Sequence, residues 1–472
     1  ALEIQRWELG AAQFQAGNPC VYTGEAIFGC ISLVLRDFAP LPERMAALEA
    51  RLRAVPALLA QGRGRLRRAP ADWIARARRE CAGAQAFLGD GIDWLRAQHG
   101  LAGGLRAAAD GAAQAFVEFD TFLQRELTPT ADGYAAGEAA IELQIRRAHF
   151  LEQGADAIAA DARGVIAECQ AALDAGAAQF GARDWREALA GLAATHPSVG
   201  DYYSRYTELW EACRATASEQ NLLSWPDYPL RYVPQPVWAR AAAPQLYFLF
   251  YRAPAAFDQV PMVEYLVTPI EPDMPADEQL RRLRATNESV IKLNHVVHHG
   301  AIGHHVQNWH AYRAPSRIGR VAAVDCASRI ALPCGGTMAE GWACYATDLM
   351  DEAGFLTPLE RYSQHHARLR MAARALVDVE LHRGRLTLDQ AAALYADAAG
   401  MAPEAARAEA VKNSMFPGAA LIYLSGTDQI HALRRTLAAR EGAAFSLRRF
   451  HDRFLSYGSI PVALIARAML AA

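Results

Sequence analysis

The sequence lacks the features that mark several large classes of protein. Its eight cysteines include no CxxC pair, which argues against both a cysteine-based zinc module and a disulfide scaffold. It has no GxxxxGK phosphate-binding loop and no GxSxG serine-nucleophile turn, so nucleotide-binding and serine-hydrolase chemistry are disfavoured. The most apolar early run, residues 26–35, has about half of the roughly 20 residues that a membrane span needs.

An excess of charge of one sign is also missing. Lys and Arg number 48 and Asp and Glu number 51, which gives a formal net charge of −3. A chain that mainly binds nucleic-acid phosphates carries a basic excess, so we expect no nucleic-acid partner. The first residues carry acid and lack the basic start and apolar block of a secretory signal. We therefore expect a cytoplasmic protein with reduced thiols and no membrane partner.

The pattern that is present is helical. The 472 residues are 52% hydrophobic and 21% charged, as in ordinary folded proteins with a large core. Apolar residues recur three and four apart over most of the chain, whereas strand-like runs occur at 228–234, 245–251 and 263–268. We expect a mainly α-helical protein of two lobes around a cleft, with a small inserted antiparallel sheet. The expected parts are a helical N-terminal lobe (1–222), a β insertion (223–275) and a helical C-terminal lobe (276–472).

Histidines are concentrated in one short segment. Six of the 14 fall within 16 residues, namely His295, His298, His299, His304, His305 and His310. Because histidine is the commonest metal ligand and the natural proton carrier near neutral pH, this concentration indicates a site. On an α-helix, His295 and His299 would share a face one turn apart. His298 and His304 would point apart, unless a break at Gly303 returned the later histidine toward the earlier one. Spacing alone leaves open which histidines converge.

A second segment supplies a carboxylate. A catalytic zinc usually has three protein ligands and one open position, so a histidine pair needs a third ligand. Glu340 lies in the run Ala-Glu-Gly-Trp-Ala-Cys-Tyr of residues 339–345, near the start of an expected helix. We predict that Glu340 is this ligand. Its alternative role is to complement the dipole of its own helix.

Both segments resemble signatures of a known family. The family is the bacterial domain-of-unknown-function family 885, a group of zinc-metallopeptidase-like proteins. The run His-His-Gly-Ala-Ile-Gly-His-His of residues 298–305 is similar to its HExxPGHH signature. Residues 340–345 are similar to its EGWAxYxE signature. Further similar segments are 18–40, 421–427 and 450–461, so the resemblance covers nearly the full chain. It implies a zincin-like, carboxypeptidase-type helical fold. It also implies His298 as first ligand, His304 or His305 as second, and Glu340 as third.

The chain departs from these signatures at the position that matters most. His299 stands where the family has its catalytic glutamate, Ile302 replaces the proline, and Thr347 replaces the later glutamate. In zincin peptidases that first glutamate takes a proton from water and passes it to the leaving amine. Three outcomes stay open. His299 replaces the glutamate as the base; it joins the metal shell with His295 or His298; or the protein is an inactive relative.

The remaining site residues are predicted from the resemblance and from chemical type. Tyr423 would donate a hydrogen bond to an oxyanion, with a packed core role as its alternative. Arg383 and Arg434 would clamp a substrate carboxylate, with internal ion pairs as their alternative. His295 is expected to support the centre from outside the ligand set.

The resulting functional prediction is a metal-dependent hydrolase. The expected metal is zinc, with iron or nickel as alternatives, and His299 is the substitute base. The expected substrate is a small peptide, amide or related carbonyl compound, and a homodimer is among the expected assemblies. The alternatives are a repurposed lyase or hydrolase acting on a small metabolite, and a catalytically inactive binding protein.

Overall fold

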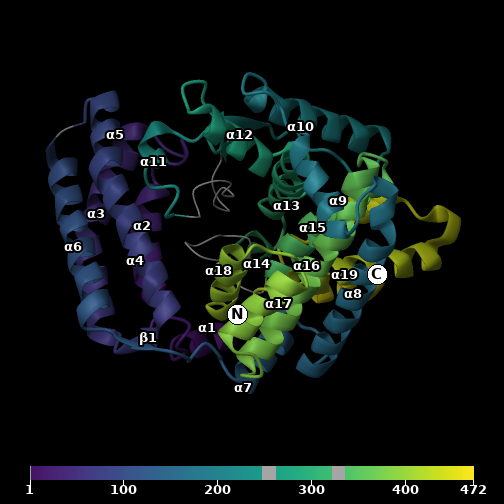
Figure 1. The fold of residues 1–472 in the computed structure, drawn as a ribbon, viewed down its shortest axis with the longest axis horizontal. Coiled ribbons are helices and arrows are strands. Elements are labelled where there is room, and N and C mark those ends of the chain that lie inside the picture. Colours follow the sequence, from purple (N-terminus) through teal and green to yellow (C-terminus); the bar gives the residue numbers. More distant parts are fainter. Residues whose placement is uncertain (1, 102, 247–261, 322–334, 472) are drawn as a thin grey trace.

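A computed structural model describes residues 2–101, 103–246, 262–321 and 335–471, and these form a mainly helical protein (Figure 1). The helices of the first half are α1 (Leu2–Glu8), α2 (Pro19–Ile31), α3 (Leu41–Arg65), α4 (Ala71–Ala86), η1 (Phe87–Gly91), α5 (Ile92–His99), α6 (Gly103–Arg125), α7 (Glu138–Leu143), η2 (Gln144–Ala148), α8 (Ala155–Gly176), η3 (Ala177–Phe180), α9 (Trp185–Ala190), η4 (Gly191–Ala194) and α10 (Tyr202–Glu219).

The helices of the second half carry the candidate site. They are α11 (Val237–Arg240), α12 (Ala276–Ala285), η5 (Val290–Gly300), α13 (His304–Ala311), α14 (Arg317–Val321), α15 (Gly336–Glu352), α16 (Pro358–His382), α17 (Leu388–Asp397), α18 (Pro403–Ser414), α19 (Ile422–Glu441), η7 (Gly442–Ala444), α20 (Leu447–Ser456) and α21 (Val462–Ala471). Local sequence sets several of their ends. Thr357 and Glu360 form a reciprocal capping box that starts α16, and Asn18 caps α2 directly before Pro19.

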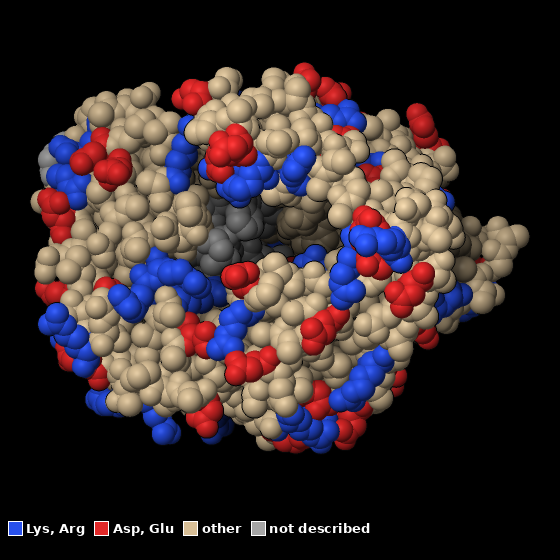
Figure 2. Space-filling view, viewed as in Figure 1, with Lys and Arg blue, Asp and Glu red and all other residues tan. Residues whose placement is uncertain are grey.

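The hydrophobic core has two large regions. One joins helices α2–α6 to parts of α16, α17 and α18. The other contains buried side chains of α10, η5, α13, α15, α19, α20 and α21. Figure 1 shows α3 and α6 on one side of the molecule and α8, α15, α16 and α19 on the other. In the same view, the space-filling surface is deeply hollowed at its centre (Figure 2).

The strands are few and short. β1 (Arg68–Pro70) pairs with β2 (Thr128–Thr130), and β3 (Leu230–Pro234) pairs with β4 (Val263–Val267). Both pairs are parallel, so the predicted antiparallel arrangement of the insertion is wrong. The chain between β3 and β4 is long and contains α11, which permits the crossover that a parallel pair needs. Of the third expected strand, Gln245 and Leu246 are not in a strand, and residues 247–251 lie outside the described residues.

Candidate metal centre

The histidine segment folds as two helices separated by a break. Helix η5 has π-helical hydrogen bonding through Gly300, and α13 begins at His304. Between them the backbone doubles back so closely that a β-carbon on Gly303 would lie 1.9 Å from the carbonyl oxygen of His298. Only glycine fits this approach. The break therefore places His304 beside His298, which an unbroken helix would not do.

Two tryptophans stabilise the break. A chain reversal leaves carbonyl oxygens without their helical partners, and buried carbonyls need replacements. The indole N–H of Trp210 donates to the Gly300 carbonyl at 2.7 Å, and that of Trp342 donates to the Ile302 carbonyl at 2.9 Å. Trp342 belongs to the Glu-Gly-Trp run of α15, so the helix that carries Glu340 also holds the break in place.

Glu340 is positioned by a close crossing of α15 and α19. A β-carbon on Gly341 would lie 2.6 Å from backbone atoms of Gly426, and one on Gly426 would lie 2.2 Å from the Thr337 carbonyl oxygen. The glycines of two distant segments thus let the two helices touch through their backbones. Thr427 Oγ1 of α19 donates across this contact to the Gly341 carbonyl at 3.4 Å, and within its own helix to the Tyr423 carbonyl at 2.8 Å.

Three side chains converge at the meeting point of η5, α13 and α15. Glu340 Oε2 lies 3.4 Å from His298 Nε2 and 3.5 Å from His304 Nε2. Glu340 Oε2 is buried and makes no hydrogen bond with the described residues. Ligand atoms bound at 2.0–2.1 Å in a tetrahedral zinc site stand about 3.3 Å apart. Glu340 therefore has the spacing of a zinc ligand from each imidazole, the ligand atoms of His298 and His304 lie within 4.8 Å of each other, and the donor types suit zinc.

Electrostatics keeps Glu340 and His298 in a ligand form. Burial raises the pKa of Glu340, but the imidazoles of His304 and His298 outweigh burial and hold that pKa well below its ordinary value. Burial lowers the pKa of His298, although Glu340 opposes the shift. At neutral pH, Glu340 is a carboxylate and His298 a neutral imidazole. Metal ions require these forms of the two side chains.

His299 faces the same group. A potential ligand atom from each of His298, His299 and His304 lies within 4.8 Å of the others. His299 Nδ1 donates to the Asn294 carbonyl oxygen at 2.7 Å, a contact across five residues that matches the π-helical turn. This contact fixes the tautomer, so Nε2 carries the lone pair. Burial, and then His298 and His304, hold the pKa of His299 well below its ordinary value, so it is neutral at pH 7.

Two other predicted histidines have partners outside this group. His305 is fully buried, stacks on the Tyr228 ring with centroids 4.6 Å apart, and donates from Nε2 to the Tyr228 carbonyl at 2.6 Å. Of the two candidates for the second ligand, the structure thus brings His304, and not His305, to Glu340. His295 Nδ1 lies 2.6 Å from the Tyr265 hydroxyl. The rings of His295 and His299 both pack against Tyr265, with centroid distances of 5.6 and 6.2 Å.

The two arginines predicted as substrate clamps have internal partners. Arg383 donates to Glu138 and to Asp156, each at 2.7 Å. Arg434 donates to both carboxylate oxygens of Glu352, at 3.0 and 2.7 Å. Both are therefore ion-paired within the protein, which was their alternative role. Chemical type could not decide this, because the partners come from distant parts of the chain.

Tyr423 lies beside the centre, among cationic residues that the sequence did not single out. Its ring is 4.8 Å from the guanidinium carbon of Arg374. Burial raises its pKa well above the ordinary value, and the Glu340 charge acts in the same direction. The cations whose charges interact with Tyr423 are Arg370 and Arg374 of α16. A signal was present in the sequence: two arginines one turn apart, Arg370 and Arg374, in an otherwise apolar stretch of helix.

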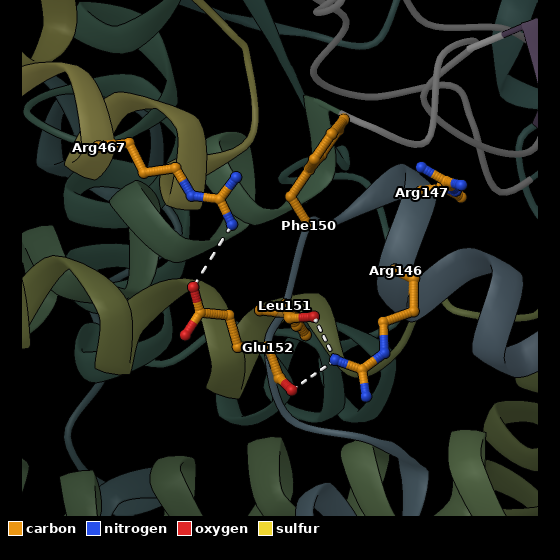
Figure 3. A pocket seen from close by; sticks show the side chains of 6 residues that line it. All are labelled: Arg146, Arg147, Phe150, Leu151, Glu152 and Arg467. Atoms are coloured by element: carbon orange, nitrogen blue, oxygen red, sulfur yellow. Dashed lines mark hydrogen bonds and ion pairs between the residues drawn. The ribbon is translucent and has the colours of Figure 1, made fainter.

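A pocket elsewhere on the molecule is built from other side chains. Figure 3 shows that it is lined by Arg146, Arg147, Phe150, Leu151, Glu152 and Arg467. Arg146 donates to the Leu151 carbonyl at 3.0 Å, and Arg467 pairs with Glu152 at 3.5 Å. Among the described residues, His298, His299 and His304 form the group whose ligand atoms have the number and spacing that a metal ion needs.

Comparisons with known proteins identify a family and a fold. The model of a family described as "Bacterial protein of unknown function (DUF885)" matches residues 5–469. No curated protein matches the chain. A structure of a putative lipoprotein of unknown function from Shewanella oneidensis is similar, with TM-score 0.71 and 22% identity over 96% of this chain and 82% of that one. A putative lipoprotein from Colwellia psychrerythraea gives TM-score 0.73 and 19% identity over 92% of this chain and 76% of that one.

These relatives correct the expected location. Both similar structures are described as putative lipoproteins, a description that conflicts with a cytoplasmic assignment, and the cytoplasmic prediction is therefore wrong. The prediction used the absence of a leader at the start of this chain, and that absence does not establish a location. Within the described ranges, no helix is both long enough and apolar enough to cross a membrane.

Proposed function

The chain belongs to the bacterial family DUF885, and we propose that it is a metal-dependent hydrolase whose ion is held by His298, His304 and Glu340. One observation carries the proposal: Glu340 Oε2, buried and without a hydrogen bond among the described residues, lies between two imidazole nitrogens at 3.4 and 3.5 Å. Two imidazoles and one carboxylate leave a fourth position open, as in catalytic zinc sites. Zinc is the metal that this donor set fits best.

The chain's own residues supply proton transfer. When bound in such a site, zinc lowers the pKa of water and polarises a carbonyl oxygen. His299 accepts the proton at Nε2, because its Nδ1–H is committed to the Asn294 carbonyl and its imidazole is neutral at pH 7. It returns the proton to the leaving group. In this proposal His299 has the role that the family signature gives to glutamate.

Tyr423 has the second role. Its hydroxyl stays protonated at neutral pH, because burial and Glu340 raise its pKa. A protonated phenol beside the centre can donate a hydrogen bond to the oxyanion that forms when a carbonyl is attacked. The proposal includes the zincin-like, carboxypeptidase-type arrangement, in which the η5–α13 break meets α15. The proposed substrate is a small peptide, amide or related carbonyl compound.

A second candidate uses the same centre for a different reaction. It is favoured by the position of His299, whose ligand atom lies within 4.8 Å of those of His298 and His304. With His299 as a further ligand, the centre becomes nitrogen-rich, a donor set that also suits iron or nickel. Such a centre would carry out a lyase or hydrolase step on a small metabolite.

Metal analysis and a hydrolysis assay test the proposal together. Plasma mass spectrometry of the purified full chain should find about one zinc ion per molecule, and Glu340→Gln and His304→Ala should each lose it. The exposed His99 serves as the control: His99→Ala should retain the metal. A chain that binds no transition metal after dialysis against zinc would refute the proposal and favour an inactive binding protein.

His299 separates the two candidate functions. If His299 is the base, His299→Ala keeps the zinc and loses cleavage of a fluorogenic peptide and amide library, and His299→Glu regains it. If His299 is a ligand, His299→Ala loses metal as well. If the zinc-loaded wild-type protein leaves the peptides intact and the His299→Glu variant cleaves them, the natural reaction is not peptide hydrolysis.

A further inference from the structure

Asp378 of α16 is a fully buried carboxylate that binds the backbone of one turn. Its Oδ1 accepts a hydrogen bond from the Gly418 N–H at 2.9 Å, and its Oδ2 accepts two, from Ala420 at 2.8 Å and from Leu421 at 2.9 Å. Burial raises the pKa of Asp378 to about 6, against these three bonds, so the carboxylate is ionised at neutral pH. A buried charge is stable only where hydrogen bonds replace its water, and here three of them do.

The turn that Asp378 binds leads directly into α19. Leu421 is the N-cap residue of this helix, and no side-chain cap is formed there. The first N–H groups of a helix lack intrahelical partners, and a negative charge near them complements the positive end of the helix dipole. Asp378 supplies an acceptor and a negative charge from another helix, because its carboxylate binds the Leu421 N–H. The start of α19 is therefore set by α16.

A second side chain holds the same turn. His149 is fully buried, and its Nε2 donates to the Gly418 carbonyl at 2.7 Å. Gly418 has a φ of +78°, which favours glycine, and a β-carbon on it would lie 2.6 Å from the β-carbon of Gln144. Because both backbone groups of Gly418 are bound and no room remains beside it, the turn has little freedom to move.

Asp378 is the middle member of a polar row along α16. Arg374, Asp378 and His382 follow one another at intervals of four residues, about one helical turn. Arg374 forms an ion pair with Glu409 of α18 at 2.7 Å, and His382 Nε2 donates to the Asn413 carbonyl of the same helix at 3.0 Å. The row therefore fastens α18, before the turn, and α19, after it, to one helix (Figure 1).

The position of α19 decides where two residues of the proposed site lie. Tyr423 is the second residue of α19, and its ring is 4.8 Å from the guanidinium carbon of Arg374. One turn further along, Gly426 touches Gly341, the residue after Glu340. A displacement of the first turns of α19 would thus move Tyr423 and press on the backbone that carries Glu340.

We infer that Asp378 is a positioning residue of the metal centre: by binding the turn at residues 418–421 it fixes α19 against α15, and so holds Glu340 in place beside the imidazoles. It acts through the backbone of this turn. The inference rests on the proposed function, because it concerns an ion held by Glu340. A role in stability alone would leave the ligand arrangement unchanged when the turn is loosened.

Metal binding tests the inference without requiring a substrate. Zinc affinity of the full chain is measured by competition with a chelator, and the visible absorption spectrum of bound Co²⁺ reports the arrangement of its ligands. Asp378→Asn keeps the shape of the side chain but turns an amide N–H₂ toward backbone donors, so the turn should loosen. We expect zinc affinity to fall by about tenfold or more, as for residues that orient metal ligands from outside, and the Co²⁺ spectrum to change.

Two further variants separate positioning from stability. Val377 is equally buried and adjacent in sequence, but it packs in the core region of helices α2–α6. Val377→Ala should therefore lower stability in urea while keeping the zinc affinity and the Co²⁺ spectrum. Gly418→Ala strains the same turn without altering Asp378 and should reproduce the effects of Asp378→Asn. It decides the question if Asp378→Asn does not fold.

The outcomes distinguish the inference from the proposed function. Wild-type zinc affinity and an unchanged Co²⁺ spectrum in the folded turn variants would overturn the inference and leave the proposed function intact. Equal losses of zinc affinity in Val377→Ala would overturn it as well, because they would reflect general destabilisation. A wild-type chain that binds neither zinc nor Co²⁺ would instead refute the proposed function.

Discussion

Gly341 and Gly426 touch through their backbones: a β-carbon on Gly341 would lie 2.6 Å from the Cα of Gly426. This contact joins the two most distinctive segments of the second half of the chain, because Gly341 follows Glu340 and Gly426 lies one turn after Tyr423. The crossing of α15 and α19 thereby fixes both the proposed third ligand and the proposed oxyanion donor. Packing and site chemistry depend on the same two glycines.

A methyl group at this crossing should damage the site. Gly341→Ala should destabilise the protein by about 1–3 kcal/mol through overpacking and shift Glu340 away from the imidazoles. Urea unfolding and zinc affinity measure the two effects. Gly111→Ala is the matched control, because Gly111 is exposed on α6 and its added β-carbon would have no neighbour within 4 Å. Unchanged zinc affinity in Gly341→Ala would show that the crossing does not position Glu340.

Gly303→Ala should weaken zinc binding, although helix propensity alone would favour alanine at this position. Alanine normally stabilises a helical position relative to glycine by roughly 0.5–1 kcal/mol. At Gly303 its methyl group would instead lie 1.9 Å from the His298 carbonyl oxygen, so the backbone must move and separate His298 from His304. We expect Gly303→Ala to lose zinc. Gly164→Ala, on an open face of α8, should retain it.

A buried ion pair anchors the start of η5. Lys292 Nζ lies 2.8 Å from Glu360 Oε2, and both side chains are at most 10% exposed. Removing one partner leaves an uncompensated buried charge, so Glu360→Ala should cost about 3–5 kcal/mol in urea unfolding. The neighbouring pair of Arg361 and Asp351 is more exposed, and Arg361→Ala should cost at most about 1 kcal/mol. Equal losses in the two variants would contradict this assignment.

Stability should fall as the pH is lowered from about 6.5 to about 4. Burial lowers the pKa of His149 and of His451, each to about 4. In that window the unfolded chain binds protons at these histidines and the folded chain does not, so acid favours unfolding. Below about pH 4 both states are protonated and the contribution levels off.

One substitution tests this pH dependence. His149→Gln keeps a donor for the Gly418 carbonyl, which His149 Nε2 contacts at 2.7 Å, but removes the titration. It should reduce the loss of unfolding free energy between pH 7 and pH 4 by about 3 kcal/mol. Urea midpoints at several pH values measure this, with His99→Gln as control. An unchanged slope in His149→Gln would mean that His149 is protonated in the folded protein.

The sequence predicted the helical class and the backbone break at Gly303, because composition and a glycine between helical segments are local signals, whereas the metal site itself stays a prediction. It could not choose between His304 and His305. That choice depends on the π-helical winding of η5 and on Tyr228, which lies far away in the sequence and binds His305. Local patterns carry no information about such partners.

Pairing between distant segments accounts for the other differences. The orientation of β3 and β4 depends on the path of the chain between them, and the partners of Arg383 and Arg434 come from other helices. Residue type indicated what these side chains can bind, and the fold determined what they do bind.

The most direct test of the account is anomalous diffraction at the zinc absorption edge from crystals of the zinc-loaded chain. The account predicts one strong peak about 2.0–2.2 Å from His298 Nε2, His304 Nε2 and Glu340 Oε2. A peak bound elsewhere, or none at these three atoms, would contradict it.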